Sequence, residues 1–96
     1  MLTFNLKKEW YERIKRGQKK VEYREVKKYW GTRLLKAKLG ELFSKKPVGC
    51  ILRLGYTRHY MTAMITRIEV VNGKDTDLHI NSPVYAIHLA DIREAQ

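Results

Sequence analysis

The start of the chain changes from one hydrophobic period to another. Apolar and polar residues alternate over positions 2–6, which predicts a short strand with one buried face. Trp10 and Ile14 then lie four positions apart on a segment that runs to Gly17, a residue type that often ends helices. The chain is therefore expected to begin with a strand, followed by an amphipathic helix over residues 7–16.

The same order of strand and helix follows a second time. Residues 19–24 alternate between apolar and charged positions, which predicts a strand with one charged face. Apolar residues then recur at helical intervals over about residues 30–43, which predicts a second helix with Gly40 as a candidate break. Pro47 ends this unit.

The rest of the chain is predicted to be mostly strand. Positions 48–54 place apolar side chains on one face, and a second strand is expected over about residues 60–71. An Asn-Gly turn signal follows, residues 74–83 show no clear period, and residues 84–92 are apolar enough for a central strand. Five strands with two helices inserted early predict an α+β fold, in which a short sheet curls into a barrel because closure removes exposed strand edges.

Length and charge narrow the picture further. At 96 residues the chain has room for one domain, spanning residues 1–96. Twenty Lys and Arg against ten Asp and Glu give a formal net charge of +10. Such an excess favours polyanionic partners through phosphate neutralisation and counterion release, so nucleic acid is the leading candidate. The alternative is a surface that is basic without a specific partner.

The cysteine content and the distribution of apolar residues bear on the cellular compartment of the protein. The single Cys50 lies in an apolar stretch and has no partner for an internal disulfide, so it is expected to be a small buried side chain in a reducing compartment. Charge interrupts residues 1–8 before a signal-peptide core could form, and no apolar run is long enough to span a bilayer. The prediction is a cytoplasmic protein without a membrane partner.

Residues 6–24 resemble the opening of ASCH domains, in which a strand and a helix lead into a G-x-K-x-x-E-x-R motif. Gly17, Lys19, Glu22 and Arg24 form that motif here. Residues 27–30 resemble the continuation in small bacterial and phage members. The resemblance implies a small PUA-like β-barrel whose cleft takes RNA or a nucleotide-derived ligand.

The resemblance also implies two activities. Some ASCH proteins are amidohydrolases that deacetylate N4-acetylcytidine with a Lys, a Thr and a Glu, and one is a ribonuclease. Lys19 matches the Lys, Glu22 stands where the Thr would be, and no residue between 69 and 80 is assigned to the Glu. A hydrolase is therefore one hypothesis for this chain, and it is expected to be metal-independent because the sequence offers no obvious cluster of metal-binding carboxylates.

Lys19, Glu22 and Arg24 are the candidate catalytic residues. Glu22 and Arg24 share one face of the predicted strand, close enough to pair or to bind one ligand together. Arg24 can bind a phosphate or a carbonyl edge, Glu22 can orient it or accept a proton, and Lys19 can act as an electrophilic clamp or in proton transfer. The alternative is a structural salt bridge at the barrel mouth.

A second candidate surface combines aromatic and basic side chains. Residues 55–60 interleave Tyr with Arg and His, a composition suited to single-stranded nucleic acid because bases stack on rings while cations hold phosphates. The alternative is an ordinary hairpin turn. Basic residues also gather on the second predicted helix. The predicted nucleic-acid-binding residues are Lys20, Lys28, Tyr29, Arg53, Tyr56, Arg58, His59 and Tyr60.

Other chemistries have little support in the sequence. The His residues and Cys50 do not fall at zinc-ligand spacing, and neither a P-loop nor a dinucleotide fingerprint is present. The sequence thus indicates no metal and no cofactor. Three functions remain open: a module that binds RNA or a nucleotide-like ligand in a basic cleft, a hydrolase acting on RNA or a modified nucleoside, and a basic adaptor for an acidic protein.

Overall fold

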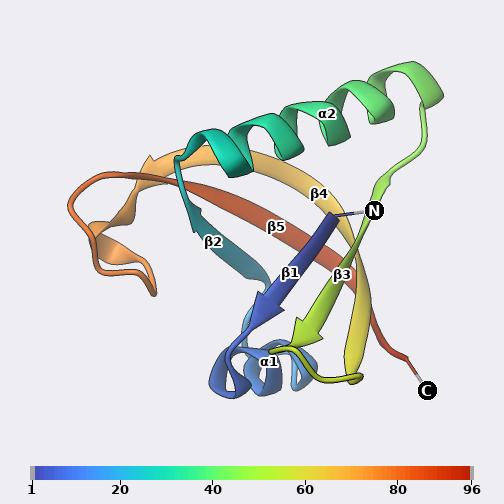
Figure 1. The fold of residues 1–96 in the computed structure, drawn as a ribbon, viewed down its shortest axis with the longest axis vertical. Helices are drawn as coiled ribbons and strands as arrows, with labels where there is room; N and C mark the ends of the chain where they lie inside the picture. The colour runs from blue at the N-terminus through green and yellow to red at the C-terminus, as the bar shows by residue number, and fades with distance from the viewer. Residues whose placement is uncertain (1, 96) are drawn as a thin grey trace.

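The structure is a computed structural model that describes residues 2–95 (Figure 1). In chain order its elements are β1 (Leu2–Leu6), α1 (Lys8–Lys15), β2 (Val21–Glu25), α2 (Lys28–Ser44), β3 (Val48–Leu54), β4 (Tyr60–Asn72), the 3-10 turn η1 (Gly73–Asp75) and β5 (Pro83–Glu94). The predicted α+β fold of five strands and two helices is confirmed. The boundaries of the predicted elements differ from these by a few residues.

The five strands form one strongly curled sheet in the order β1-β3-β4-β5-β2. The β1–β3 pair is parallel and the other three pairs are antiparallel. Register shifts in β4, between Thr62 and Met64 and between Ile65 and Arg67, bend the longest strand. The sheet curls into a half-barrel, with α2 across one end and α1 across the other (Figure 1).

The closed barrel expected from the sequence is not completed by a strand ladder. Within residues 2–95, β1 and β2 lie at the two ends of the strand order and do not pair with each other. Both strands have five residues, too few to wrap around the sheet as β4 and β5 do. Side chains therefore close the seam between β1 and β2.

The core lies inside the curl. Phe4, Leu52, Met61 and Ile87 are fully buried there, and α1 adds Ile14 from one end. Cys50 is also fully buried, as the apolar stretch around it predicts. The alternation in residues 48–54 is confirmed, since β3 buries Cys50 and Leu52 on one face.

The second helix is less buried than its apolar repeat suggests. Only Leu34 is fully buried on α2, while four large apolar side chains further along are exposed. Gly40 does not break the helix, because its backbone continues in helical geometry to Ser44. The N-terminal half packs closely on the sheet: a Cβ on Gly31 would lie 3.1 Å from the hydroxyl of Tyr85. The C-terminal half extends past the sheet (Figure 1).

Within the described residues, no helix combines the length and the apolar character needed to cross a bilayer.

Candidate functional site

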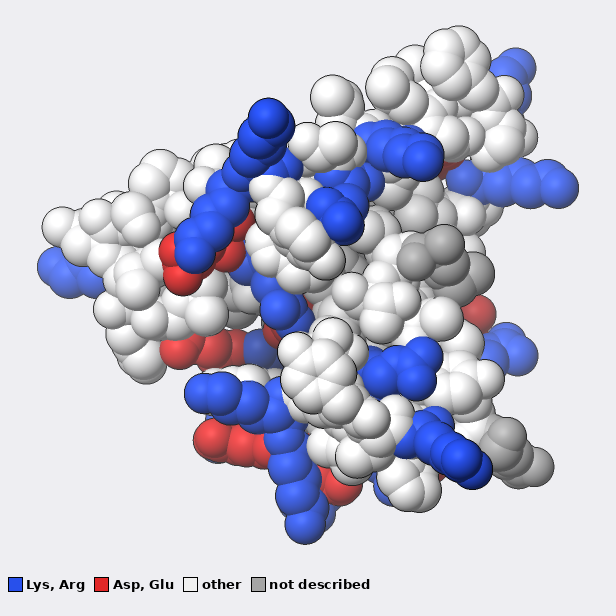
Figure 2. Space-filling model, viewed as in Figure 1, with Lys and Arg blue, Asp and Glu red and all other residues white. Residues whose placement is uncertain are grey.

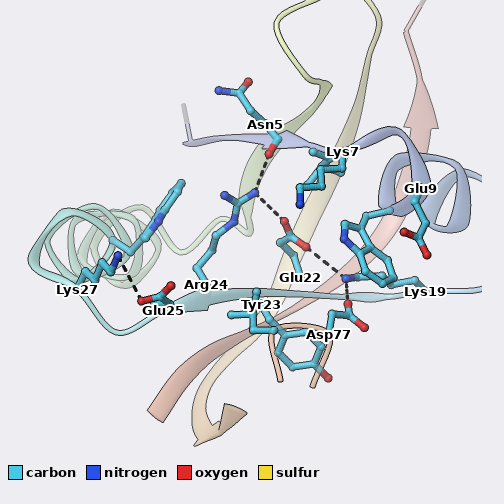
Figure 3. A pocket seen from close by; sticks show the side chains of 14 residues that line it. Asn5, Lys7, Glu9, Lys19, Glu22, Tyr23, Arg24, Glu25, Lys27 and Asp77 are labelled. Carbon is cyan, nitrogen blue, oxygen red and sulfur yellow. Dashed lines mark hydrogen bonds and ion pairs between the residues drawn. The ribbon is translucent and has the colours of Figure 1, made fainter. Parts of the chain in front are cut away.

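A cleft of about 510 Å³ lies at the seam between β1 and β2 (Figure 3). The end of β1, the start of α1, the inner face of β2, the start of α2 and the loop after η1 all contribute to it. It is lined by Asn5, Leu6, Lys7, Glu9, Trp10, Lys19, Glu22, Tyr23, Arg24, Glu25, Lys27, Trp30, Asp77 and Leu78. The three candidate catalytic residues all line this one cleft.

Charged side chains form a continuous chain of ion pairs along the cleft (Figure 3). Lys19 pairs with Asp77, and its Nζ lies 3.5 Å from Glu22 Oε1. The other carboxylate oxygen, Oε2, accepts a 2.7 Å hydrogen bond from Arg24 Nη2. The same guanidinium nitrogen donates at 3.0 Å to the backbone carbonyl of Asn5. The side chains of Lys19 and Glu22 are only 10% and 6% exposed, so the centre of this network is largely shielded from water.

The local sequence explains how these side chains converge. Glu22 and Arg24 are two residues apart on β2 and point to its inner side, which is the charged face predicted from the alternation. Lys19 follows a turn at Gly17, whose φ of 77° favours glycine. The backbone N–H groups of Gln18 and Lys19 both donate to the carbonyl of Arg13, which fixes the turn against α1.

Arg24 is the side chain that bridges the open seam of the sheet. It extends from β2 to the backbone of β1, and its guanidinium carbon lies 5.4 Å from the ring centre of Phe4 and 5.0 Å from that of Trp30. The rings of Phe4 and Trp30 are themselves stacked at 5.1 Å. The Nε of Arg24 is buried and has no hydrogen-bond partner among the described residues. Arg24 thus stabilises the seam as well as lining the cleft.

Aromatic rings form the walls near Lys19. The Lys19 ammonium lies 4.6 Å from the ring centre of Trp10 and 5.5 Å from that of Tyr23, within range of cation–π attraction. Burial raises the pKa of the Tyr23 hydroxyl, with smaller contributions from the carboxylates of Asp77 and Glu69. The cleft therefore combines flat apolar surface with donors and acceptors that are held in place.

The cleft itself carries no excess charge. Its basic lining residues are Lys7, Lys19, Arg24 and Lys27, and its acidic lining residues are Glu9, Glu22, Glu25 and Asp77. This differs from the basic cleft expected from the composition. The whole net charge of +10 consequently lies on the surface outside the cleft. Figure 2 shows Lys and Arg spread over much of the visible face, with most of the visible carboxylates on its left half.

The other predicted binding residues lie outside the cleft. Lys20 and Lys28 are exposed next to lining residues, and Tyr29 lines a separate groove on α2. The remaining five residues, which are Arg53, Tyr56, Arg58, His59 and Tyr60, lie on or beside the β3–β4 turn.

The β3–β4 turn lies at the same end of β1 as the cleft. The Gly55 N–H donates at 2.8 Å to the carbonyl of Leu6, and Leu6 lines the cleft. Tyr56 is almost fully exposed at the tip, and the guanidinium carbon of Arg53 lies 5.7 Å from the ring centre of Tyr60. An exposed aromatic and basic surface thus lies close to the cleft, although no residue of this turn lines it.

Asp77 and Trp10 are two lining residues in contact with Lys19 that sequence reasoning missed. Asp77 lies in the segment without a clear period, 58 positions from its partner Lys19, so no local pattern connects the two. The buried Thr76 hydroxyl, which donates at 2.8 Å to the carbonyl of Gly73, fixes the turn that presents Asp77. Trp10 looked like a helix core residue, and its helical spacing carries no signal for a cleft.

The structure also bears on two other kinds of site, a cysteine nucleophile and a metal centre. Burial raises the pKa of the Cys50 thiol to about 12, with a smaller contribution from the Glu22 carboxylate, so this thiol is a poor nucleophile at neutral pH. Among residues 2–95, no group of three or more His, Cys, Asp or Glu side chains is placed to hold a metal ion.

No known family model matches the chain. Comparisons with curated proteins and with solved structures likewise give no match.

Proposed function

We propose that the chain binds RNA or a nucleotide-derived ligand, with a base in the cleft and phosphates on the surrounding basic surface. The observation that carries this proposal is the separation of charge: the cleft lining is balanced, while the entire net charge of +10 lies outside it. A free phosphate would be attracted to a cationic pocket. A neutral base instead needs both donors and acceptors beside flat apolar surface.

The contacts in the cleft fit a base edge. Glu22 and Asp77 can accept hydrogen bonds from exocyclic amino groups, and Arg24 and Lys19 can donate to ring nitrogens and carbonyl oxygens. Trp10 supplies ring surface beside them. Since these groups are already paired with each other, the site is preorganised and a ligand has to exchange existing bonds rather than order free side chains.

The surface around the cleft fits a phosphate backbone. Lys28 lies at the start of α2, and Arg58 and His59 lie on the β3–β4 turn that is hydrogen-bonded to the end of β1. Tyr56 adds an exposed ring on which a neighbouring base can stack. The resemblance of residues 6–24 to ASCH domains supports the same proposal.

The test separates base binding from phosphate binding. Mononucleoside binding followed by titration calorimetry should weaken at least about tenfold in Trp10→Leu and Lys19→Met, with little dependence on salt. Binding of a short single-stranded RNA, followed by fluorescence anisotropy, should fall steeply with salt, and the salt slope should decrease by about one for Arg58→Met. The control is Lys45→Met, which removes the same charge far from the cleft.

Two results would count against this assignment. If RNA binds equally well to wild type, Trp10→Leu and Lys19→Met, the cleft is not part of the binding site. If neither nucleosides nor RNA bind at low salt, the proposal fails as a whole.

The ion-pair chain favours a second candidate, a metal-independent hydrolase acting on RNA or on a modified nucleoside such as N4-acetylcytidine. The Lys19 ammonium lies between the carboxylates of Glu22 and Asp77 at the cleft wall. An ammonium can stabilise a developing oxyanion while a carboxylate accepts the proton of an attacking water. Asp77 is the better placed of the two carboxylates to reach water, because its side chain is the more exposed.

Turnover assays distinguish this candidate from binding alone. Incubation of N4-acetylcytidine or RNA with the protein in excess chelator should give product, and Lys19→Ala, Glu22→Gln and Asp77→Asn should abolish it while circular dichroism shows an intact fold. Absence of product with both substrates would leave the binding function alone. Loss of activity in chelator that returns with magnesium would refute a metal-independent reaction.

A further inference from the structure

A row of exposed apolar side chains lies on the C-terminal half of α2. Leu35, Leu39, Leu42 and Phe43 are 61%, 44%, 69% and 82% exposed. At 3.6 residues per turn these four positions share one side of the helix, which is not the side that buries Leu34. Soluble proteins seldom expose contiguous apolar surface of this kind unless it meets a partner. We refer to these four residues as the α2 apolar stripe.

Basic side chains flank the α2 apolar stripe on both sides. Residues 33–46 contain five basic side chains and a single acidic one, Glu41. Arg33 and Lys36 lie along one side of the stripe and Lys38 along the other. Glu41 is already paired with Lys38 at 3.4 Å. The stripe is therefore complementary to an apolar row flanked by carboxylates.

A second copy of the chain is a poor occupant of this surface. Pairing two α2 helices would bring these cations together, with only Glu41 from each copy to offset them. The net charge of +10 on each chain adds long-range repulsion. Charge thus favours a partner of opposite sign over self-association.

The shape of the surface favours a polypeptide over a bilayer. A groove of about 450 Å³ lies on one side of the stripe, lined by Leu2, Thr3, Tyr29, Arg33, Lys36, Ala37, Val48 and Gly49. A second hollow of about 660 Å³ lies on the other side, lined by Lys38, Glu41, Leu42, Lys45, Lys46 and Pro47. A flat membrane surface would touch the ridge and leave both hollows unfilled, whereas the side chains of a helix can enter them.

We propose that the α2 apolar stripe binds an amphipathic helix of an acidic partner protein, whose apolar face is flanked by Asp and Glu. The surface is separate from the cleft, since none of the four stripe residues lines it. In Figure 2 uncharged surface lies at the free end of α2, with Lys and Arg side chains projecting beside it. Binding of a base in the cleft and docking of this partner can therefore be tested independently.

A displayed library of helix-forming peptides with randomised surface positions provides the test. Selection on the wild-type protein should enrich peptides with a net negative charge and apolar residues at intervals of three and four. One enriched peptide is then synthesised and its binding measured by fluorescence anisotropy. Its dissociation constant should rise at least about tenfold in Leu42→Ser/Phe43→Ser and several-fold in Lys36→Glu.

The controls distinguish the stripe from other surfaces and from misfolding. Val70→Ser changes an exposed apolar side chain on β4 and should leave peptide binding unchanged, as should Lys19→Met in the cleft. Because the two substituted stripe residues are exposed, the double variant should match wild type in circular dichroism and thermal unfolding. Failure of the cleft assignment would leave this result untouched.

Three outcomes would overturn the proposal. The first is enrichment of peptides that are not acidic, or of peptides whose affinity for the double variant equals their affinity for the wild type. The second is a dimer in sedimentation velocity that disappears in the double variant, which would assign the stripe to a second copy. The third is binding to phosphatidylserine vesicles that requires the stripe, with no peptide enriched, which would assign it to a lipid surface.

Discussion

The cleft and the free half of α2 use basic and apolar residues in opposite ways. In the cleft, Lys19 and Arg24 are paired with carboxylates and lie near aromatic rings, so each charged group depends on its neighbours. On α2, Leu42 and Phe43 are largely exposed and have cations beside them along the helix. The cleft residues therefore stabilise the fold in addition to the ligand-binding role proposed for them, whereas the exposed α2 residues contribute little to the fold.

The largest expected effect on stability is at the seam. Arg24→Met would leave the buried Glu22 without its closest cation and remove the bridge to β1, with an expected cost of about 3 kcal/mol in the free energy of unfolding. Urea denaturation followed by circular dichroism measures this cost.

A matched control exists on β4 for the seam variant. Arg67 pairs with Glu69 at the same spacing of two residues but is 67% exposed, so Arg67→Met should cost less than about 1 kcal/mol. Equal losses for the two variants would show that the ion pair at the seam contributes no more to stability than an ordinary surface pair.

A second effect reports on the core beneath the cleft. The folded state holds the pKa of Cys50 at about 12 against an ordinary 9.0, so it keeps a proton that the unfolded chain loses as the pH rises. This contribution is fully present below pH 9 and is lost towards pH 12; by about pH 10.5 roughly 2 kcal/mol should be gone. Chemical denaturation below pH 9 and at about pH 10.5 should show that the free energy of unfolding falls less in Cys50→Ala than in wild type as the pH rises. An equal fall of the free energy of unfolding in both proteins would contradict the raised pKa of Cys50.

Two glycines on the same helix give a sharper comparison. Gly40 lies in the free half of α2 with open space around its Cβ position, so Gly40→Ala should raise the free energy of unfolding by about 0.5–1 kcal/mol. Gly31 lies in the packed half, where the new Cβ would meet the Tyr85 hydroxyl at 3.1 Å, which should cancel that gain. Thermal unfolding of both variants decides this, and equal gains would mean that the two halves are equally unconstrained.

The smallest expected effect is on the α2 apolar stripe itself. Leu42→Ser/Phe43→Ser removes two exposed side chains and should change the free energy of unfolding by less than about 0.5 kcal/mol. Urea denaturation measures it. A loss above 2 kcal/mol would show that the stripe is part of the core in solution, and the partner proposal would lose its basis.

Much of the fold was predictable because its signals are local. Alternation identified β1, β2 and β3, apolar content identified β5, helical spacing identified both helices, and the apolar stretch around Cys50 indicated burial. Lys19, Glu22 and Arg24 were recognisable as one cluster because they lie within six residues of each other. The open seam was not predictable, since it depends on how far two short edge strands reach around the curl.

The cations of the cleft, Lys19 and Arg24, could therefore be predicted from the sequence, and the carboxylate of Asp77 could not. Asp77 reaches Lys19 only after the sheet has curled and the loop at Thr76 has packed, and the charge balance of the cleft follows from that meeting. The same holds for α2: spacing showed where its leucines fall on the helix, but only packing decided that Leu34 faces the sheet and Leu35, Leu39 and Leu42 face solvent. Periodicity records the interval between side chains along one element, whereas long-range contacts determine what each face meets.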